Sequence, residues 1–236
     1  MQQVYSQYTK EDHEVWNILF NRQRTKIAEH ASVRYNGALD QLSDIFYKER
    51  LPNYENLTKR LLEATGWRIE VVPGLIEIDQ FYSLLAEKAF PASTWIRKRS
   101  QLDYLEEPDM FHDSFGHLPL LVERDFADFT HRLGLLGQKH SQNEKRLIEL
   151  QRIYWYTLEF GLINENGIRK AYGAGLMSSG GEIEFAMSPK PEVLPFRIEE
   201  VIARPFDSMS IQELYFEITD FEDLHKALDD WEKTVD

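Results

Sequence analysis

Apolar residues recur at helical spacing through the first third of the chain. The first series predicts a helix over about residues 10–30, with oxygen-bearing residues at Thr9–Asp12 placed to cap its first turn. Two further series, within residues 39–46 and 57–62, predict two more helices, and Gly66 is the residue type favoured just past a helix end. We therefore expect an α-helical first third.

Strand-like alternation is confined to short stretches. Residues 67–72 alternate with a period of two and stop at Pro73-Gly74. Asn166-Gly167 predicts a tight turn before a short strand at 168–171, and residues 214–218 form another predicted strand.

Helical spacing fills most of the remaining sequence. It covers residues 81–89 and 122–163, the latter with a polar interruption at 137–144. Capping-box sequences at Ser179–Glu182 and Thr219–Glu222 predict two further helices, the second running to about residue 234. The expected fold class is mainly α with a few short β-strands.

Composition narrows the class of protein. The 236 residues are enough for one large domain with a core and a pocket, and we expect residues 1–236 to form a single domain. A net charge of −13 without a basic stripe argues against nucleic acid and anionic membranes as partners. Because the chain has no cysteine, any metal must be bound by His and carboxylate side chains. Residues 1–14 lack an apolar signal core, and no segment approaches the roughly 20 apolar residues of a membrane span, so we expect a soluble, cytoplasmic protein.

Two histidines, His112 and His117, lie five residues apart in a segment that also contains Gly116 and Pro119. On an unbroken α-helix their side chains would point about 140° apart, so purely structural roles stay open for both. Gly116 and Pro119 can end the helix and let His117 turn back toward His112. The pair is therefore a candidate for two imidazole ligands of one metal.

Glu159 lies in an aromatic-rich run, with Trp155 and Tyr156 one turn before it and Leu162 and Ile163 one turn after it. Its helical face is predicted to be apolar, and a carboxylate there needs a cation, either a basic side chain or a metal. Two imidazoles and one carboxylate can hold a non-haem iron and leave three coordination positions open for dioxygen and a co-substrate.

Other residues offer candidate binding groups. Arg97 and Asp109 could pair, either as a core ion pair or so as to leave guanidinium donors for a substrate carboxylate. Phe81 and the turn Pro73–Ile76 could present a stacking face and a backbone edge to a planar heterocycle, although Phe81 also fits a core position. Ser178 follows a small-residue stretch and could fix the orientation of a metal-bound imidazole.

Three segments, in this order, resemble the pterin-dependent aromatic amino acid hydroxylases. They are Tyr104–Leu121 (YLEEPDMFHDSFGHLPLL), Tyr154–Leu162 (YWYTLEFGL) and Lys170–Ser179 (KAYGAGLMSS). The resemblance spans essentially the whole chain and corresponds to the family's catalytic domain, without the regulatory domain or the tetramer-forming tail of the animal enzymes. It implies one catalytic domain, and we expect a monomer.

The resemblance also implies the cofactors. Iron(II) would be bound by His112, His117 and Glu159. A tetrahydropterin, either tetrahydrobiopterin or a bacterial analogue, would stack on Phe81, and its further contacts would be Gly74, Leu75, Ile76 and Asp113. The amino acid would place its carboxylate on Arg97, which Asp109 holds, and its further contacts would be Pro108, Trp155, Phe160, Gly175 and Ser178.

Substrate choice is indicated by single positions. Trp155 matches the phenylalanine and tyrosine hydroxylases, whereas tryptophan hydroxylases usually carry Phe there. Asp113 and Leu105 follow the bacterial form of the motif, where animal enzymes typically carry Glu and Thr. Glu217 stands where relatives usually carry an apolar residue, and it could contact the substrate's ammonium group or shift the ring. The expected activity is phenylalanine 4-monooxygenase, which makes L-tyrosine from L-phenylalanine, dioxygen and a tetrahydropterin.

Three alternatives stay open. A shift of the substrate ring by about an ångström would give a tryptophan 5-hydroxylase or a phenylalanine 3-hydroxylase. Zinc on the same three side chains could activate water in a metal-dependent hydrolase. The chain could also bind pterin or amino acid without catalysis.

Overall fold

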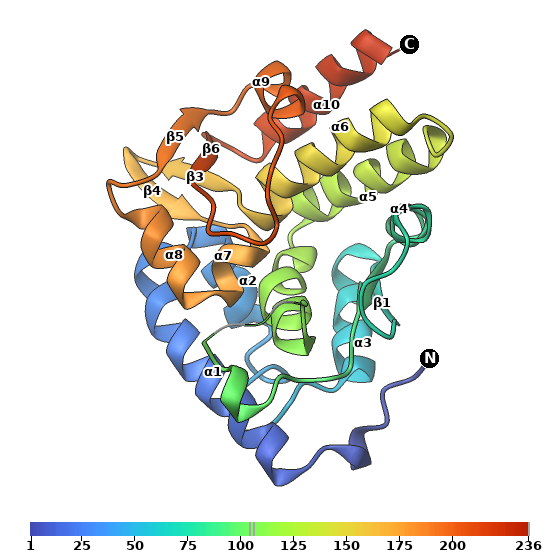
Figure 1. The fold of residues 1–236 in the computed structure, drawn as a ribbon. Coiled ribbons are helices and arrows are strands. Elements are labelled where there is room, and N and C mark those ends of the chain that lie inside the picture. The colour runs from blue at the N-terminus through green and yellow to red at the C-terminus, as the bar shows by residue number, and fades with distance from the viewer. Residues whose placement is uncertain (104, 106, 236) are drawn as a thin grey trace.

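The structure is a computed structural model that describes residues 1–103, 105 and 107–235; Tyr104, Glu106 and Asp236, and with them two positions of the Tyr104–Leu121 segment, lie outside the described residues. The helices are α1 (Lys10–His30), α2 (Val33–Gln41), α3 (Tyr54–Thr65), α4 (Ile78–Ala86), α5 (Arg124–Lys139), α6 (Glu144–Tyr154), α7 (Ala174–Ser178), α8 (Gly180–Met187), α9 (Ile198–Ala203) and α10 (Glu222–Val235). The strands are β1 (Arg68–Val71), β2 (Ala89–Ala92), β3 (Leu162–Glu165), β4 (Ile168–Ala171), β5 (Glu192–Pro195) and β6 (Leu214–Ile218). The mainly α fold with a few short strands is confirmed (Figure 1).

The segment from Met110 to Val122 passes through the middle of the fold, with α1 along one side and α3 along the other (Figure 1). It is anchored by Phe111 and Phe115, whose rings stack with centroids 4.9 Å apart. Phe111 meets Trp16 of α1 at 5.4 Å and Phe115 meets Phe20 of α1 at 5.2 Å. This aromatic core fixes one side of the segment that carries both candidate histidines.

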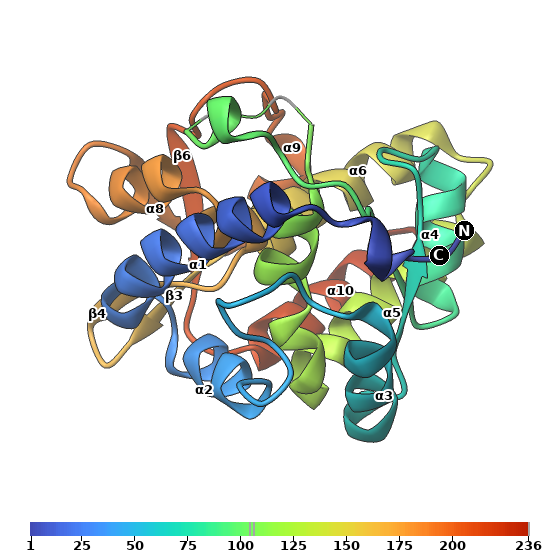
Figure 2. The same ribbon diagram turned by 90° about the horizontal axis from the view of Figure 1, so that it is seen from below.

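The larger sheet lies beside this central segment and has the strand order β4-β3-β6-β5. β3 and β4 form an antiparallel hairpin across Asn166 and Gly167, which both have positive φ, so the predicted tight turn is confirmed. β6 is parallel to β3 and to β5, while β1 and β2 form a separate parallel pair. In the view of Figure 2, α1 runs across the front of the molecule toward β4.

Several predicted boundaries are confirmed. α1 spans residues 10–30, and Thr9 and Asp12 cap it reciprocally. Gly66 ends α3 in the left-handed conformation. Ser179 accepts a hydrogen bond from the Glu182 amide at the start of α8, as in one half of a capping box. The Glu182 carboxylate instead accepts from Tyr215 and from the Gln212 amide.

Other boundaries differ from the prediction. The second helix ends at Gln41, because residues 40–46 form successive turns, although Phe46 remains buried. Ala89 is in β2 rather than in a helix, paired with Arg68. Ile163 is in β3, after the helix has ended at Glu159.

The cap of the last helix is also shifted by one residue. The carboxylate of Asp223, not that of Glu222, accepts the amides of Thr219 and Asp220. Among the described residues, no helix combines the length and apolar character that crossing a bilayer requires.

Candidate metal centre

His112 and His117 occupy a π-helical turn that spans them both. Hydrogen bonds in a π-helix join residues five apart, so residues with that spacing come onto one face. The turn ends at His117, before Pro119, where an end was expected, but Gly116 itself is a buried part of this widened turn rather than its end. The widened turn nevertheless does what the helix end was expected to do, since it brings the two imidazoles together.

Glu159 closes a second π-helical turn, Trp155–Glu159, in which the Phe160 amide donates to the Trp155 carbonyl over 2.9 Å. The predicted apolar helical face is therefore only partly correct, because Leu162 and Ile163 belong to a strand. Glu159 is still shielded from solvent, with its side chain 13% exposed.

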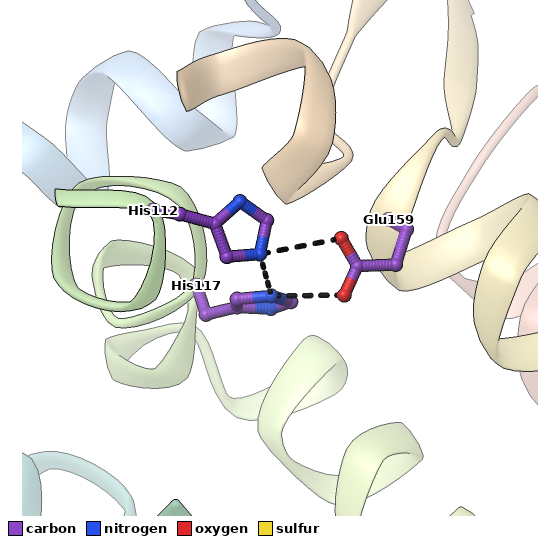
Figure 3. Close-up of side chains that lie close together, drawn as sticks. All are labelled: His112, His117 and Glu159. Carbon is purple, nitrogen blue, oxygen red and sulfur yellow. Dashed lines mark hydrogen bonds and ion pairs between the residues drawn. The ribbon is translucent and has the colours of Figure 1, made fainter. Parts of the chain in front are cut away.

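The three side chains point toward one another from these two turns (Figure 3). His117 Nε2 lies 3.0 Å from Glu159 Oε1 and 3.2 Å from His112 Nε2, and His112 Nε2 lies 3.6 Å from Glu159 Oε2. Three ligands bonded at about 2.0–2.2 Å to one ion, roughly at right angles, have donor atoms about 3 Å apart. The observed spacing therefore fits three neighbouring positions around one metal ion.

The protonation of His112 is set by Ser178. Ser178 Oγ donates to the Ala174 carbonyl over 2.8 Å, so it accepts from His112 Nδ1, 2.9 Å away. The Nε2 lone pair of His112 is then directed at the other two ligands. Burial lowers the pKa of His112 to about 4, which keeps the imidazole neutral. The predicted role of Ser178 in orienting an imidazole agrees with this contact.

The charge state of Glu159 also suits a metal. Burial by itself raises the pKa of this carboxyl, but the neighbouring imidazoles and a hydrogen bond from Tyr154 outweigh burial and hold the pKa at about 2. The carboxylate and the imidazole nitrogens that face it are all metal-binding groups, and a cation can replace the proton that His117 Nε2 shares with Glu159. The donor set therefore favours a bound cation at this point.

Small residues allow the two turns to approach each other. A Cβ atom on Gly173 would lie 2.4 Å from the Glu159 carbonyl oxygen, and one on Gly116 would lie 2.8 Å from the Ala174 carbonyl oxygen. The stretch Gly173-Ala174-Gly175 therefore packs between the turn that carries the histidines and the turn that carries the glutamate.

Comparison with known proteins agrees with this geometry. A family model described as biopterin-dependent aromatic amino acid hydroxylase matches residues 2–236. The chain belongs to this family.

Its relatives include two bacterial phenylalanine-4-hydroxylases. The one from Vibrio cholerae is 39% identical over 220 residues, which are 93% of this chain and 75% of that protein. The one from Pseudomonas aeruginosa is 40% identical over 217 residues, 92% of this chain and 81% of that protein. The solved phenylalanine hydroxylase of Chromobacterium violaceum with bound iron(III) and 7,8-dihydrobiopterin has a TM-score of 0.92 at 38% identity, covering 96% of this chain and 82% of that one.

The predicted pairing of Arg97 with Asp109 is present. Arg97 Nε and Nη2 donate to the two Asp109 carboxylate oxygens over 2.8 and 2.9 Å, and both side chains are buried. Asp109 also accepts from the His112 amide over 3.1 Å. The pair thus fixes the start of the histidine turn, and Nη1 of the guanidinium takes no part in these described contacts.

On the other side of the triad, Phe81 of α4 meets Tyr154 edge-on, with centroids 5.1 Å apart, and Tyr154 in turn lies 6.2 Å from the His117 ring. Phe81 is partly buried and packs against the core. Asp113 accepts from the Ser93 amide over 2.7 Å, and burial raises its pKa to about 7.

The turn that precedes α4 contains Gly74, Leu75 and Ile76. Leu75 is 72% exposed there, so this turn is open to solvent.

The aromatic residues predicted to face the substrate gather near Glu159. The rings of Trp155 and Phe160 lie 4.7 Å apart, and Gly175 packs directly against the Phe160 ring. Pro108 is partly buried just before Asp109.

A cavity of about 640 Å³ lies between α1 and the start of α8, with Phe111 and Ser178 in its wall, but none of the three candidate metal ligands lines it.

Two outcomes were not anticipated from the sequence. Glu217 is tied to the sheet, where its carboxylate accepts from Asn164 over 3.0 Å and lies 3.6 Å from Arg169 Nε. Tyr154, which bonds to Glu159, was not identified as a site residue; its position five residues before Glu159 becomes informative only once the turn is known to be π-helical.

Proposed function

We propose that the protein is a phenylalanine 4-monooxygenase that uses iron(II), dioxygen and a tetrahydropterin to convert L-phenylalanine to L-tyrosine, with residues 1–236 acting as one catalytic domain. The observation that carries the proposal is the convergence of His112, His117 and Glu159, whose ligand atoms all lie within 4.8 Å of one another. Two imidazoles and one carboxylate leave open positions on an octahedral iron. The named bacterial relatives support phenylalanine as the substrate.

The bound iron and tetrahydropterin together supply the oxidising chemistry, and the protein supplies binding, orientation and exclusion of water. His112 is kept neutral and aimed by Ser178, so it binds metal through Nε2. Glu159 stays ionised and accepts from Tyr154, which limits its rotation. The π-helical turns thus hold three ligands in place on one side of the metal and leave the other side free.

The pterin is proposed to lie on the Phe81 side of the centre. Phe81 would provide a stacking face, and the exposed turn Gly74–Ile76 would provide backbone donors and acceptors for the edge of the heterocycle. Asp113 lies next to His112 in the chain and would contact the pterin from the histidine turn.

The amino acid is proposed to bind between Arg97 and the aromatic residues after α6. Asp109 accepts one N–H from Nε and one from Nη2 of Arg97, so the Nη1 amino group and the second N–H of Nη2 remain as donors for the substrate carboxylate. The substrate ring would pack among Trp155, Phe160 and Pro108, and Gly175 and Ser178 would line the side nearest the metal. Buried aromatic walls suit a phenyl ring and keep water away from the reacting carbon.

The decisive experiment supplies the protein anaerobically with iron(II), then adds oxygen, a tetrahydropterin and each aromatic amino acid in turn. We expect p-tyrosine from phenylalanine, and no turnover by Glu159→Ala, while the matched Glu63→Ala at an exposed position retains activity. Formation of m-tyrosine or 5-hydroxytryptophan would change the regiochemistry or substrate. Unchanged turnover by Glu159→Ala would refute the ligand assignment, and turnover without oxygen uptake would indicate a hydrolase.

The protein is also proposed to act as a monomer in the cytoplasm, because its proposed substrates are small cytoplasmic metabolites. Light scattering during size-exclusion chromatography tests whether the protein is a monomer, and cell fractionation tests its location.

A further inference from the structure

The segment between α9 and β6, Arg204–Glu213, reaches back toward the metal centre. In Figure 1 it runs from α9 down to the level of α7 and returns to β6. Tyr156 Oη donates to the Pro205 carbonyl over 2.9 Å, and the Phe206 ring stacks on Trp155 with centroids 4.3 Å apart and planes 10° apart. The 204–213 segment is therefore attached to two residues of the π-helical turn that carries Glu159.

Gln212 joins this segment to Trp155 by a specific set of hydrogen bonds. Its Oε1 accepts from Trp155 Nε1 over 2.9 Å, while its Nε2 donates to the carbonyls of Asp207 and Ser210 over 2.7 and 2.8 Å. Because both amide hydrogens are used on carbonyl oxygens, the amide oxygen must face the indole, which can only donate. Gln212 is 6% exposed, so water does not readily replace these partners.

The backbone of Gln212 is fixed as well. Its amide donates to Glu182 Oε1 over 3.3 Å, and Tyr215 Oη donates to Glu182 Oε2 over 2.9 Å. Burial raises the pKa of Glu182, and these two donors act in the opposite direction. Gln212 is thus anchored to the start of α8 on one side and to Trp155 on the other.

Contacts with three side chains hold the indole of Trp155 in place. Phe206 covers one face, Phe160 lies 4.7 Å away at a tilt, and Gln212 binds the only polar atom of the ring. The amide of Phe160 is bonded to the Trp155 carbonyl within the turn that ends at Glu159. A change in the indole's orientation would therefore move a wall of the pocket next to a metal ligand.

We infer that Gln212 is a positioning residue for the aromatic substrate, because it fixes the indole against which the substrate ring packs. This inference rests on the proposed function, in which Trp155 lines the amino acid pocket. Gln212 acts through Trp155 and sets the depth and tilt of the ring, and hence which ring carbon is hydroxylated. Residues 204–213 then form a rigid outer wall of the substrate pocket.

The test uses Gln212→Met, which keeps the length of the side chain and removes all three of its hydrogen bonds. Met209→Ala is the matched control, because Met209 is on the same segment and 58% exposed. For Gln212→Met we expect the KM for phenylalanine to rise about three- to tenfold, as for the loss of one buried hydrogen bond. The yield of p-tyrosine per tetrahydropterin oxidised should fall, and the KM for tetrahydropterin should not change.

A second readout requires neither metal nor turnover. In protein labelled with ¹⁵N-tryptophan, the Trp155 indole N–H is one of five signals and is identified by its loss in Trp155→Phe. Hydrogen-bonded, buried N–H groups exchange slowly with solvent. We expect faster exchange at this signal in Gln212→Met and retained protection in Met209→Ala.

The outcomes separate the two proposals. If the wild type makes no tyrosine from phenylalanine, the proposed function is wrong and this inference fails with it. If the wild type is active but Gln212→Met keeps its phenylalanine KM, coupling and product, the inference alone is overturned. It is also overturned if Met209→Ala loses as much as Gln212→Met, since the integrity of the segment rather than the indole contact would then decide the effect.

Discussion

Ser178→Ala should weaken metal binding without altering the fold. Ser178 Oγ accepts from His112 Nδ1 at 2.9 Å and donates to the Ala174 carbonyl at 2.8 Å, so it fixes both the ring orientation and the tautomer of His112. Without the hydroxyl, the imidazole can rotate and can place its proton on Nε2. Both changes oppose metal binding through that nitrogen.

The size of the effect follows from the exposure of His112. Loss of a partner that orients a metal ligand typically costs 10–100-fold in affinity, and each tenfold corresponds to about 1.4 kcal/mol. The upper end applies when the orphaned N–H is wholly buried, because a lost hydrogen bond and an unsatisfied donor then add. The His112 side chain is 19% exposed, so water can partly replace the hydroxyl. We therefore expect about a tenfold increase in the dissociation constant.

The assay is an anaerobic calorimetric titration of iron(II) or cobalt(II) into metal-free protein. Ser43→Ala is the matched control, because Ser43 is exposed and bonds only to the nearby Asp40 carbonyl among its described contacts. The metal-free unfolding temperatures of the two variants should agree. A dissociation constant for Ser178→Ala within about twofold of the wild type would refute the reasoning, because losing a group that orients a metal ligand costs more than that.

Three further predictions concern the supports of the site. Asp109→Asn should lower the free energy of unfolding by roughly 3–5 kcal/mol in urea denaturation, because it leaves the Arg97 guanidinium buried without its counter-charge; a loss below about 1 kcal/mol would mean that solvent reaches Arg97. Gly173→Ala should lower the free energy of unfolding by about 1–3 kcal/mol, because the new Cβ would lie 2.4 Å from the Glu159 carbonyl oxygen. Gly37→Ala, in the middle of α2 and with no atom within 4 Å of its Cβ, should raise the free energy of unfolding by roughly 0.5–1 kcal/mol. Equal effects of the two changes would contradict the close packing at Gly173. Cobalt(II) at about 100 times its dissociation constant should stabilise the wild type by about 2.7 kcal/mol, and Glu159→Gln should lose most of this gain in thermal unfolding; a full gain in the variant would place the ion elsewhere.

The chemistry of the site could be predicted from the sequence, but the backbone that assembles it could not. Imidazoles, a carboxylate and a hydroxyl are recognisable by residue type, and the polar groups proposed for metal binding do converge. The π-helical turns carry no comparable signal, because the local sequence around His112 and His117 is compatible with an ordinary helix. The register is set by distant packing, in which Phe111 and Phe115 enter the aromatic core under α1.

Contacts between residues far apart in the sequence could not be predicted either. Trp155 and Gln212 are 57 residues apart, and no spacing rule links an indole to an amide on a later loop. Glu217 shows the same limit, because its residue type left its role open, and only the strand register, opposite Leu162, reveals its bond to Asn164. The predicted helix ends were wrong where strand pairing with a distant segment overrode the helical periodicity, as at Ala89 in β2.

The two π-helical turns explain how a small set of supports can serve both stability and binding. One turn is held by the stacked phenylalanines of the core, and the other is held from the outside by residues 204–213. The ligand atoms are already close together, so binding a cation requires little ordering of the chain. The carboxylate and imidazole atoms lie 3.0–3.6 Å apart, so a cation has mainly to replace the proton that His117 shares with Glu159. The fold therefore keeps the three donor groups together before a metal binds, and in the proposed enzyme the remaining positions of the metal would be left for dioxygen and a co-substrate.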